Sequence, residues 1–121
     1  MLGRILIIDD NPIDLRLEAE LLELRGYKVD VASDAEQAQS ILSGVLPDLI
    51  VTDIALPGMD GLTALKKIRE IDAAARVIIC SALGQQQLIV QAIQLGAKDF
   101  IVKPFQPRRV IAALKKALDI T

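Results

Sequence analysis

The chain has 121 residues, 52% of them hydrophobic, and a formal net charge of −2 from 14 basic and 16 acidic side chains. This length suits one domain with its own core, and the charge balance argues against a general nucleic-acid binder, which needs a basic surplus. The lack of histidine excludes Ser-His-Asp and Cys-His catalysis, and the single cysteine, Cys80, excludes an internal disulfide.

The first residues do not resemble a secretion signal. Their apolar run is about five residues long and ends at Asp9 and Asp10, whereas a signal peptide needs a longer apolar region and a cleavage site. No stretch approaches the ~20 apolar residues of a membrane span. We therefore expect a cytoplasmic protein that does not insert into membranes.

Short apolar runs alternate with longer amphipathic segments, a pattern typical of βα units around a parallel sheet. The predicted strands are Arg4–Ile8, Lys28–Ala32, Leu49–Thr52, Val77–Cys80 and Phe100–Val102. The predicted helices run from the cap Asn11–Pro12 to about Arg25, from a capping box at Ser33–Glu36, over Gly61–Ile71, over Gln85–Leu95 and over Pro107–Leu118. We expect one domain over residues 1–121, with no output domain after the last helix.

The first and fourth helices have apolar faces that can be assigned on a helical wheel. In the first helix we expect one stripe to face the core and a second, opposite stripe to be partly exposed. The core stripe is Ile13, Leu17, Leu21 and Leu24, and the opposite one is Leu15, Ala19 and Leu22. In the fourth helix we expect a core stripe of Leu88, Ile89, Ala92 and Ile93 and an outer face of Gln85, Gln86, Gln91 and Gln94.

Reactive side chains follow four of the five predicted strands. They are Asp9 and Asp10, then Asp53, then Ser81, then Lys103. Ligands of an open parallel sheet bind beyond the carboxyl ends of its strands, so these groups would converge. Clustered carboxylates repel one another unless a cation such as Mg²⁺ joins them, and a hydroxyl and an ammonium can bind an oxyanion. Each residue alone could be an ordinary turn or surface residue, but together they indicate a phosphoryl site with its metal.

At this point the chain resembles the receiver domains of two-component response regulators, over essentially its whole length. The motifs that carry the resemblance are Ile7–Asn11, Asp53–Gly61, Cys80–Ala82 and Gly96–Phe105, and the segment Ser81–Pro107 is most similar to chemotaxis-type stand-alone regulators. The resemblance implies a flavodoxin-like (βα)5 fold, a doubly wound five-stranded parallel sheet in strand order 2-1-3-4-5.

The resemblance also implies a role for each site residue. Asp53 would accept a phosphoryl group from a histidine kinase, a phosphotransfer protein or a small donor. Mg²⁺, with Mn²⁺ as a substitute, would bind Asp10, Asp53 and the backbone carbonyl of Ala55 directly and Asp9 mainly through water. Ser81 and Lys103 would bind the phosphoryl group, Phe100 would be the aromatic switch residue, and the Lys103–Pro104 peptide would be cis. The chain would catalyse only its own phosphorylation and slow dephosphorylation.

Some positions depart from the usual receiver pattern. Ser81 replaces the commoner threonine, and Phe100 lacks the hydroxyl of the commoner tyrosine, so its burial is easier. Ala55 and Leu83, which flank the phosphoryl site, have no side-chain group that can orient an attacking water. We therefore expect a long-lived phosphorylated form.

Two surfaces are candidates for partners. We expect part of the first helix, Leu15 and Leu22, to dock a histidine kinase or phosphotransfer protein. The face of helix four, strand five and helix five, which carries Gln91, Gln94, Arg108 and Arg109, would bind an output protein. The protein would be a monomer or weak dimer.

Three other functions are alternatives to a phosphoacceptor. A small phosphatase with an aspartyl nucleophile is disfavoured because Asp9–Ile13 lacks the D-x-D-x-[TV] pattern, and a flavin binder because no hydroxyl- and glycine-rich loop follows the first strand. A receiver-like scaffold that acts without phosphorylation stays open. Within the receiver class, chemotaxis is the first choice of pathway, and a phosphorelay intermediate or a regulator of cell-cycle or developmental kinases is the alternative.

Overall fold

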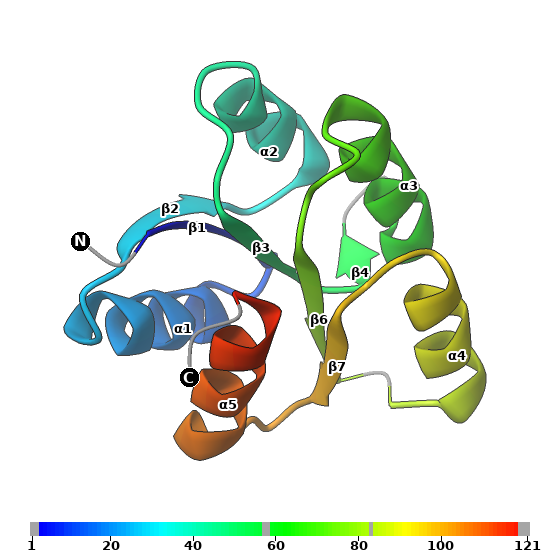
Figure 1. Ribbon diagram of the computed structural model, residues 1–121. Helices are drawn as coiled ribbons and strands as arrows, with labels where there is room; N and C mark the ends of the chain where they lie inside the picture. Colours follow the sequence, from blue (N-terminus) through cyan, green and yellow to red (C-terminus); the bar gives the residue numbers. More distant parts are fainter. Residues whose placement is uncertain (1–2, 57–58, 83, 119–121) are drawn as a thin grey trace.

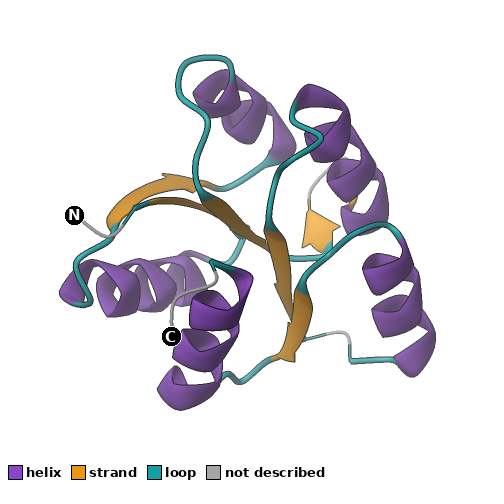
Figure 2. Ribbon diagram, viewed as in Figure 1, coloured by secondary structure: helices purple, strands orange, loops and turns teal. Residues whose placement is uncertain are grey.

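The computed structural model describes residues 3–56, 59–82 and 84–118, which form a parallel sheet between two layers of helices (Figures 1 and 2). The sheet consists of β1 (Arg4–Ile8), β2 (Lys28–Ala32), β3 (Leu49–Thr52), β6 (Val77–Ser81) and β7 (Asp99–Val102). The helices are α1 (Pro12–Leu24), α2 (Ala35–Leu42), α3 (Gly61–Ile71), α4 (Gln86–Gln94) and α5 (Pro107–Ala117). All ten elements match predicted ones, with bounds that are identical or differ by one or two residues.

The strand order in the sheet is β2-β1-β3-β6-β7, and every pair of neighbours is parallel. This is the predicted flavodoxin-like order 2-1-3-4-5, counted over these five strands. A small antiparallel pair, β4 (Ala55–Leu56) and β5 (Met59–Asp60), was not predicted and precedes α3. No described helix is long and apolar enough to cross a membrane.

The central strands are buried on both faces because nearly every residue in them is aliphatic. In β1, Ile5 and Ile7 pack against α1 and α5, whereas Leu6 and Ile8 pack against α2, α3 and α4. Successive side chains of a strand point to opposite faces, so one run of four apolar residues serves two cores. Figure 1 shows these two layers, with α1 and α5 on one face of the sheet and α2, α3 and α4 on the other.

The sequence signals at the helix ends are largely present in the structure. The Asn11 side chain accepts hydrogen bonds from the amides of Ile13 and Asp14, with Pro12 at the first helical position. Gly96 ends α4 with φ +105°, a conformation that favours glycine, and a Cβ there would displace the Arg69 side chain, whose Nε would lie 2.8 Å away.

The capping box of α2 was predicted one residue too early. Asp34, not Ser33, is the cap, since its carboxylate accepts from the amide of Gln37 at 2.8 Å. The Gln37 side chain in turn accepts from both the amide and the hydroxyl of Ser33. The arrangement is therefore similar to a capping box, but the return bond from the Gln37 side chain is to Ser33, the residue before the cap, and Glu36 takes no part in it.

The predicted faces of α1 were wrong. The residues that face the core are Glu18, Ala19 and Leu22, with Leu15 partly buried beside them. The stripe expected in the core is largely in solvent: Ile13 is 70% exposed, Leu17 51% and Leu24 85%, and only Leu21 is partly buried. The α4 assignment fails at one position, because Ile93 is 45% exposed, while Ala92 is buried and Leu88 and Ile89 pack against the core.

Candidate functional site

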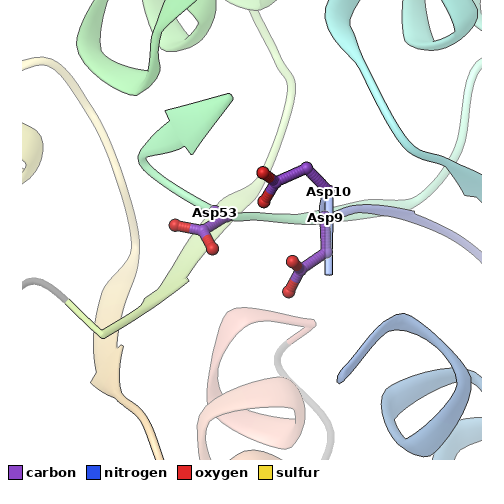
Figure 3. Close-up of side chains that lie close together, drawn as sticks. All are labelled: Asp9, Asp10 and Asp53. Carbon is purple, nitrogen blue, oxygen red and sulfur yellow. The ribbon is translucent and has the colours of Figure 1, made fainter. Parts of the chain in front are cut away.

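The acidic residues of the site are positioned by the register of β1 and β3. Ile8 is paired with Thr52, so the next residues, Asp9 and Asp53, leave the sheet at the same level. The amide of Asp53 donates to the carbonyl of Ile8 at 2.9 Å, which fixes the two strand ends to each other. Figure 3 shows the carboxylates of Asp9, Asp10 and Asp53 gathered at this edge of the sheet.

These three carboxylates fit a magnesium ion. One oxygen from each lies within 4.8 Å of the others, and Asp9 and Asp53 are buried while Asp10 is exposed. Mg²⁺ prefers oxygen ligands, uses few carboxylates and keeps several waters, so a site with one solvent-facing side suits it. The predicted contribution of the Ala55 carbonyl stays a prediction.

Lys103 is held by three carboxylates, two of which belong to the acidic cluster. Its Nζ atom donates to Oδ2 of Asp9 at 2.6 Å, to Oδ2 of Asp53 at 3.0 Å and to Oδ2 of Asp14 at 3.0 Å. The Lys103 side chain is only 9% exposed. Its backbone is fixed as well, because its amide donates to the carbonyl of Ser81 and its bond to Pro104 is cis, as the resemblance implied.

The electrostatics of this cluster keep the lysine charged. Burial acts to lower the pKa of Lys103, but its hydrogen bonds to Asp9, Asp53 and Asp14 outweigh burial, and the pKa is raised above its ordinary value. Burial also raises the pKa of Asp9, although the hydrogen bonds from Lys103 and from the Asn11 amide oppose it. The ammonium is therefore a permanent positive charge beside the Asp53 carboxylate.

Ser81 and Phe100 lie on the neighbouring strands β6 and β7. Ser81 ends β6, next to β3, and is 1% exposed. Phe100 is paired with Ile79 and is 7% exposed, within the core cluster that includes Ala92 of α4. Their predicted roles in phosphoryl binding and switching stay predictions.

Sequence reasoning missed two acidic residues of α1, Asp14 and Glu18. Asp14 is a third partner of Lys103. Glu18, one helical turn further on, is 2% exposed, and its Oε2 has no hydrogen-bond partner in the structure. Burial raises the pKa of Glu18 to about 7, a hydrogen bond with Cys80 opposes the rise, and the charge of Asp9 adds to it. The sequence did offer a signal. Asp14 and Glu18 are four residues apart on a helix that directly follows Asp9 and Asp10, so they lie on one face of that helix.

The predicted partner residues have different surroundings. Gln91, Gln94 and Arg108 are exposed. Arg109 is exposed but makes a bidentate ion pair with Asp99, at 2.7 and 3.0 Å. The proposed use of Leu22 for docking was wrong, because Leu22 is fully buried. Leu15 is partly buried and packs against the core, and its docking role stays a prediction. Leu83 lies outside the described residues.

An apolar groove adjoins the site between α1 and the start of α5. It has a volume of about 300 Å³ and is lined by Asp14, Leu17, Leu21, Pro104, Phe105 and Pro107. Asp14 therefore lines the groove and is also one of the three carboxylates that bind Lys103. This places the groove directly beside the phosphoacceptor candidate.

Comparison with known proteins places the chain in one family. The family model of the response regulator receiver domain matches residues 5–115. The chain is 48% identical over 120 residues to the chemotaxis protein CheY of Bacillus subtilis, and the aligned region covers 98% of this chain and 100% of that protein. It is 43% identical over 114 residues to CheY of Thermotoga maritima, covering 93% of this chain and 95% of the relative.

Solved structures agree. A CheY-like receiver domain protein from Methanospirillum hungatei superposes with a TM-score of 0.92 at 30% identity, covering 98% of this chain and 95% of the other. A CheX–CheY–BeF3–Mg²⁺ complex from Borrelia burgdorferi gives a TM-score of 0.89 at 35% identity, covering 93% of this chain and 87% of the other. With the strand order, the acidic cluster and the family match in agreement, the chain belongs to the response regulator receiver family.

Proposed function

We propose that the protein accepts a phosphoryl group on Asp53 from a histidine kinase or phosphotransfer protein, with Mg²⁺ bound, and thereby changes its affinity for an output partner. The observation that carries this proposal is the position of Lys103 Nζ, 3.0 Å from Oδ2 of an Asp53 carboxylate that shares its site with two further aspartates. Phosphoryl transfer depends mostly on positioning and charge neutralisation, which this arrangement offers.

Each residue of the site contributes to the transfer. Asp10 and Asp53, with Asp9 mainly through water, would hold Mg²⁺, which would neutralise charge on the phosphoryl oxygens. The Lys103 ammonium offers a second positive charge and can exchange one carboxylate partner for a phosphoryl oxygen. The Ser81 hydroxyl, at the end of the adjacent strand, donates to another oxygen. The chain in this proposal catalyses only its own phosphorylation and dephosphorylation.

Switching would follow from the movement of Ser81 toward the phosphoryl group. The space beside β6 would then favour the buried position of Phe100, and the surface of α4, β7 and α5 would change with it. Gln91, Gln94 and Arg108 offer a neutral-to-basic surface for an acidic or amphipathic output segment. We propose a chemotaxis pathway, supported by the CheY relatives.

The donor protein would dock on α1. In the proposed contact surface, the exposed Ile13 and Leu17 and the adjoining groove take the place of the buried Leu22. An apolar surface of this kind beside a charged site suits the helices of a donor protein. We expect Leu17→Glu to slow transfer from a kinase or phosphotransfer protein while leaving the reaction with a small phosphodonor unchanged. Equal transfer by wild type and variant would rule this surface out.

The function is tested by intact mass after treatment with acetyl phosphate. We expect a gain of one phosphoryl group (~80 Da) that requires both Mg²⁺ and Asp53 and is absent from Asp53→Asn. A gain that persists in Asp53→Asn would identify a different acceptor. No gain in the wild type would favour the scaffold function.

A further inference from the structure

Three carboxylates bind the Lys103 ammonium: Asp9, Asp14 and Asp53. Asp14 alone is neither part of the metal cluster nor the phosphoacceptor, so its role is unexplained. It comes from the first turn of α1, and its Oδ2 accepts from Lys103 Nζ at 3.0 Å. An ammonium has three hydrogens, so Asp9, Asp14 and Asp53 together use its full donor capacity. Asp14 thus determines, with Asp9, where the ammonium points when Asp53 reacts.

Asp14 differs from its two companions in exposure. The Asp9 side chain is 2% exposed and that of Asp53 10%, whereas that of Asp14 is 29% exposed. Asp14 also lines the apolar groove, so it faces the side from which a donor bound there would reach the site. The charge of Asp14 therefore interacts with an incoming donor more directly than the charge of the buried Asp9 does.

The distance between Asp14 and the acceptor is short enough for this charge to matter. Oδ2 of Asp14 and Oδ2 of Asp53 lie within about 6 Å of each other, because each is 3.0 Å from the same nitrogen. At such separations, within a Debye length and partly shielded from water, charges interact appreciably. A negative charge here repels the carboxylate that leaves an acyl phosphate, whereas it attracts the protonated nitrogen of a bound phosphoramidate, which then leaves as a neutral amine.

We propose that Asp14 is a positioning residue for Lys103 and that its charge makes the site prefer nitrogen-linked phosphodonors, such as a phosphohistidine, over acyl phosphates. The inference rests on the proposed function of Asp53. In the step concerned, an Asp53 oxygen forms a bond to phosphorus as the bond to the leaving group breaks. Acetate leaves acetyl phosphate as an anion with the bonding pair, whereas ammonia leaves phosphoramidate from an already protonated nitrogen.

The test compares the phosphorylation rates of Asp53 with acetyl phosphate and with phosphoramidate, at saturating Mg²⁺, by intact mass. In Asp14→Asn the ratio of the acetyl phosphate rate to the phosphoramidate rate rises about threefold or more, and the increase shrinks at high salt. Asp14→Glu keeps the charge and leaves the ratio unchanged. Glu23→Gln, which removes an exposed charge on the outer side of the same helix, also leaves it unchanged.

The positioning role has its own readout in the ¹⁵N NMR signal of the Lys103 ammonium. Three charged partners slow hydrogen exchange, so the signal is visible in the wild type and broadens in Asp14→Ala, but not in Glu23→Gln. An unchanged rate ratio in Asp14→Asn, or an equal change in Glu23→Gln, overturns the donor preference. If the wild type gains no phosphoryl group from either donor, the proposed function itself fails, and this inference fails with it.

Discussion

Glu18 is a carboxyl group inside an aliphatic core, and it makes the stability of the fold depend on pH. The pKa of Glu18 is about 7 in the folded protein against 4.5 for the ordinary side chain. A raised pKa means that the folded state binds the proton more tightly than the unfolded state does. The resulting stabilisation of the fold is complete below about pH 4.5 and is lost as pH rises through 7. Above that range the core must hold a charge.

The first prediction concerns the variant Glu18→Gln in magnesium-free buffer. Between pH 5 and pH 9 the free energy of unfolding of the wild type should fall by about 2–3 kcal/mol relative to that of the variant. Urea unfolding at each pH measures the difference. Glu23→Gln, an exposed neighbour on α1, is the control and should follow the wild type. Parallel curves for wild type and Glu18→Gln would mean that Glu18 does not hold its proton.

A second prediction concerns the lifetime of the aspartyl phosphate. Alanine at position 55 and leucine at position 83 have no polar side-chain group with which to orient a hydrolytic water. We expect the phosphorylated form to last for minutes or longer, and Ala55→Asn to shorten its lifetime. The decay of the phosphorylated mass after removal of acetyl phosphate measures both. A half-life of seconds in the wild type would contradict the argument.

The residues of the site divide into those that the sequence could predict and those that it could not. Asp9, Asp10, Asp53 and Lys103 follow strands, and the ends of parallel strands converge at one edge, so their meeting could be predicted. Asp14 lies in a helix, where an acidic residue is normally taken to face solvent. Its partnership with Lys103, 89 residues later, depends on tertiary packing.

At the scale of elements, α1 shows why an apolar pattern can be assigned to the wrong face. The helix has leucines on two sides, and the buried side carries Glu18, which lowers its apparent hydrophobicity. Counting apolar residues therefore favoured the stripe of Ile13, Leu17 and Leu24, which is exposed. A buried carboxylate is rare enough that composition alone favours the opposite orientation.

The third prediction tests the corrected orientation with the same substitution on each side of α1. Leu22→Ala, at a fully buried position, should lower the free energy of unfolding by about 3 kcal/mol because it leaves a cavity. Leu17→Ala, at a position 51% exposed, should change it by less than about 1 kcal/mol. Urea denaturation of both variants at one pH measures the two effects. Equal losses would place both leucines in the core.

At the scale of the whole molecule, the topology could be predicted because the strands are continuous aliphatic runs separated by helix-length segments. Such runs, alternating with helix-length segments, are typical of a parallel sheet covered on both faces. The β4–β5 pair could not be predicted, because two-residue strands carry too little pattern to be distinguished from a turn. The fold thus follows from patterns that extend over many residues.

The last prediction concerns the balance of charge at the end of the sheet. Folding brings Asp9, Asp10 and Asp53 together, and their mutual repulsion opposes the folded state. A cation that binds only the folded form should offset this, by about 2.7 kcal/mol when Mg²⁺ is present at a hundred times its dissociation constant. Urea unfolding is measured with Mg²⁺ and with NaCl of equal ionic strength. The difference between the two free energies of unfolding is the stabilisation by bound Mg²⁺ rather than by screening.

Asp10→Asn separates metal binding from general screening. Asp10 is exposed, so the substitution leaves the core intact and removes one of the repelling charges. Without Mg²⁺ the variant should be at least as stable as the wild type, and with Mg²⁺ it should gain much less, because a ligand is gone. If both proteins gained equally from Mg²⁺, or if NaCl had the same effect, the ion would not be held by this cluster.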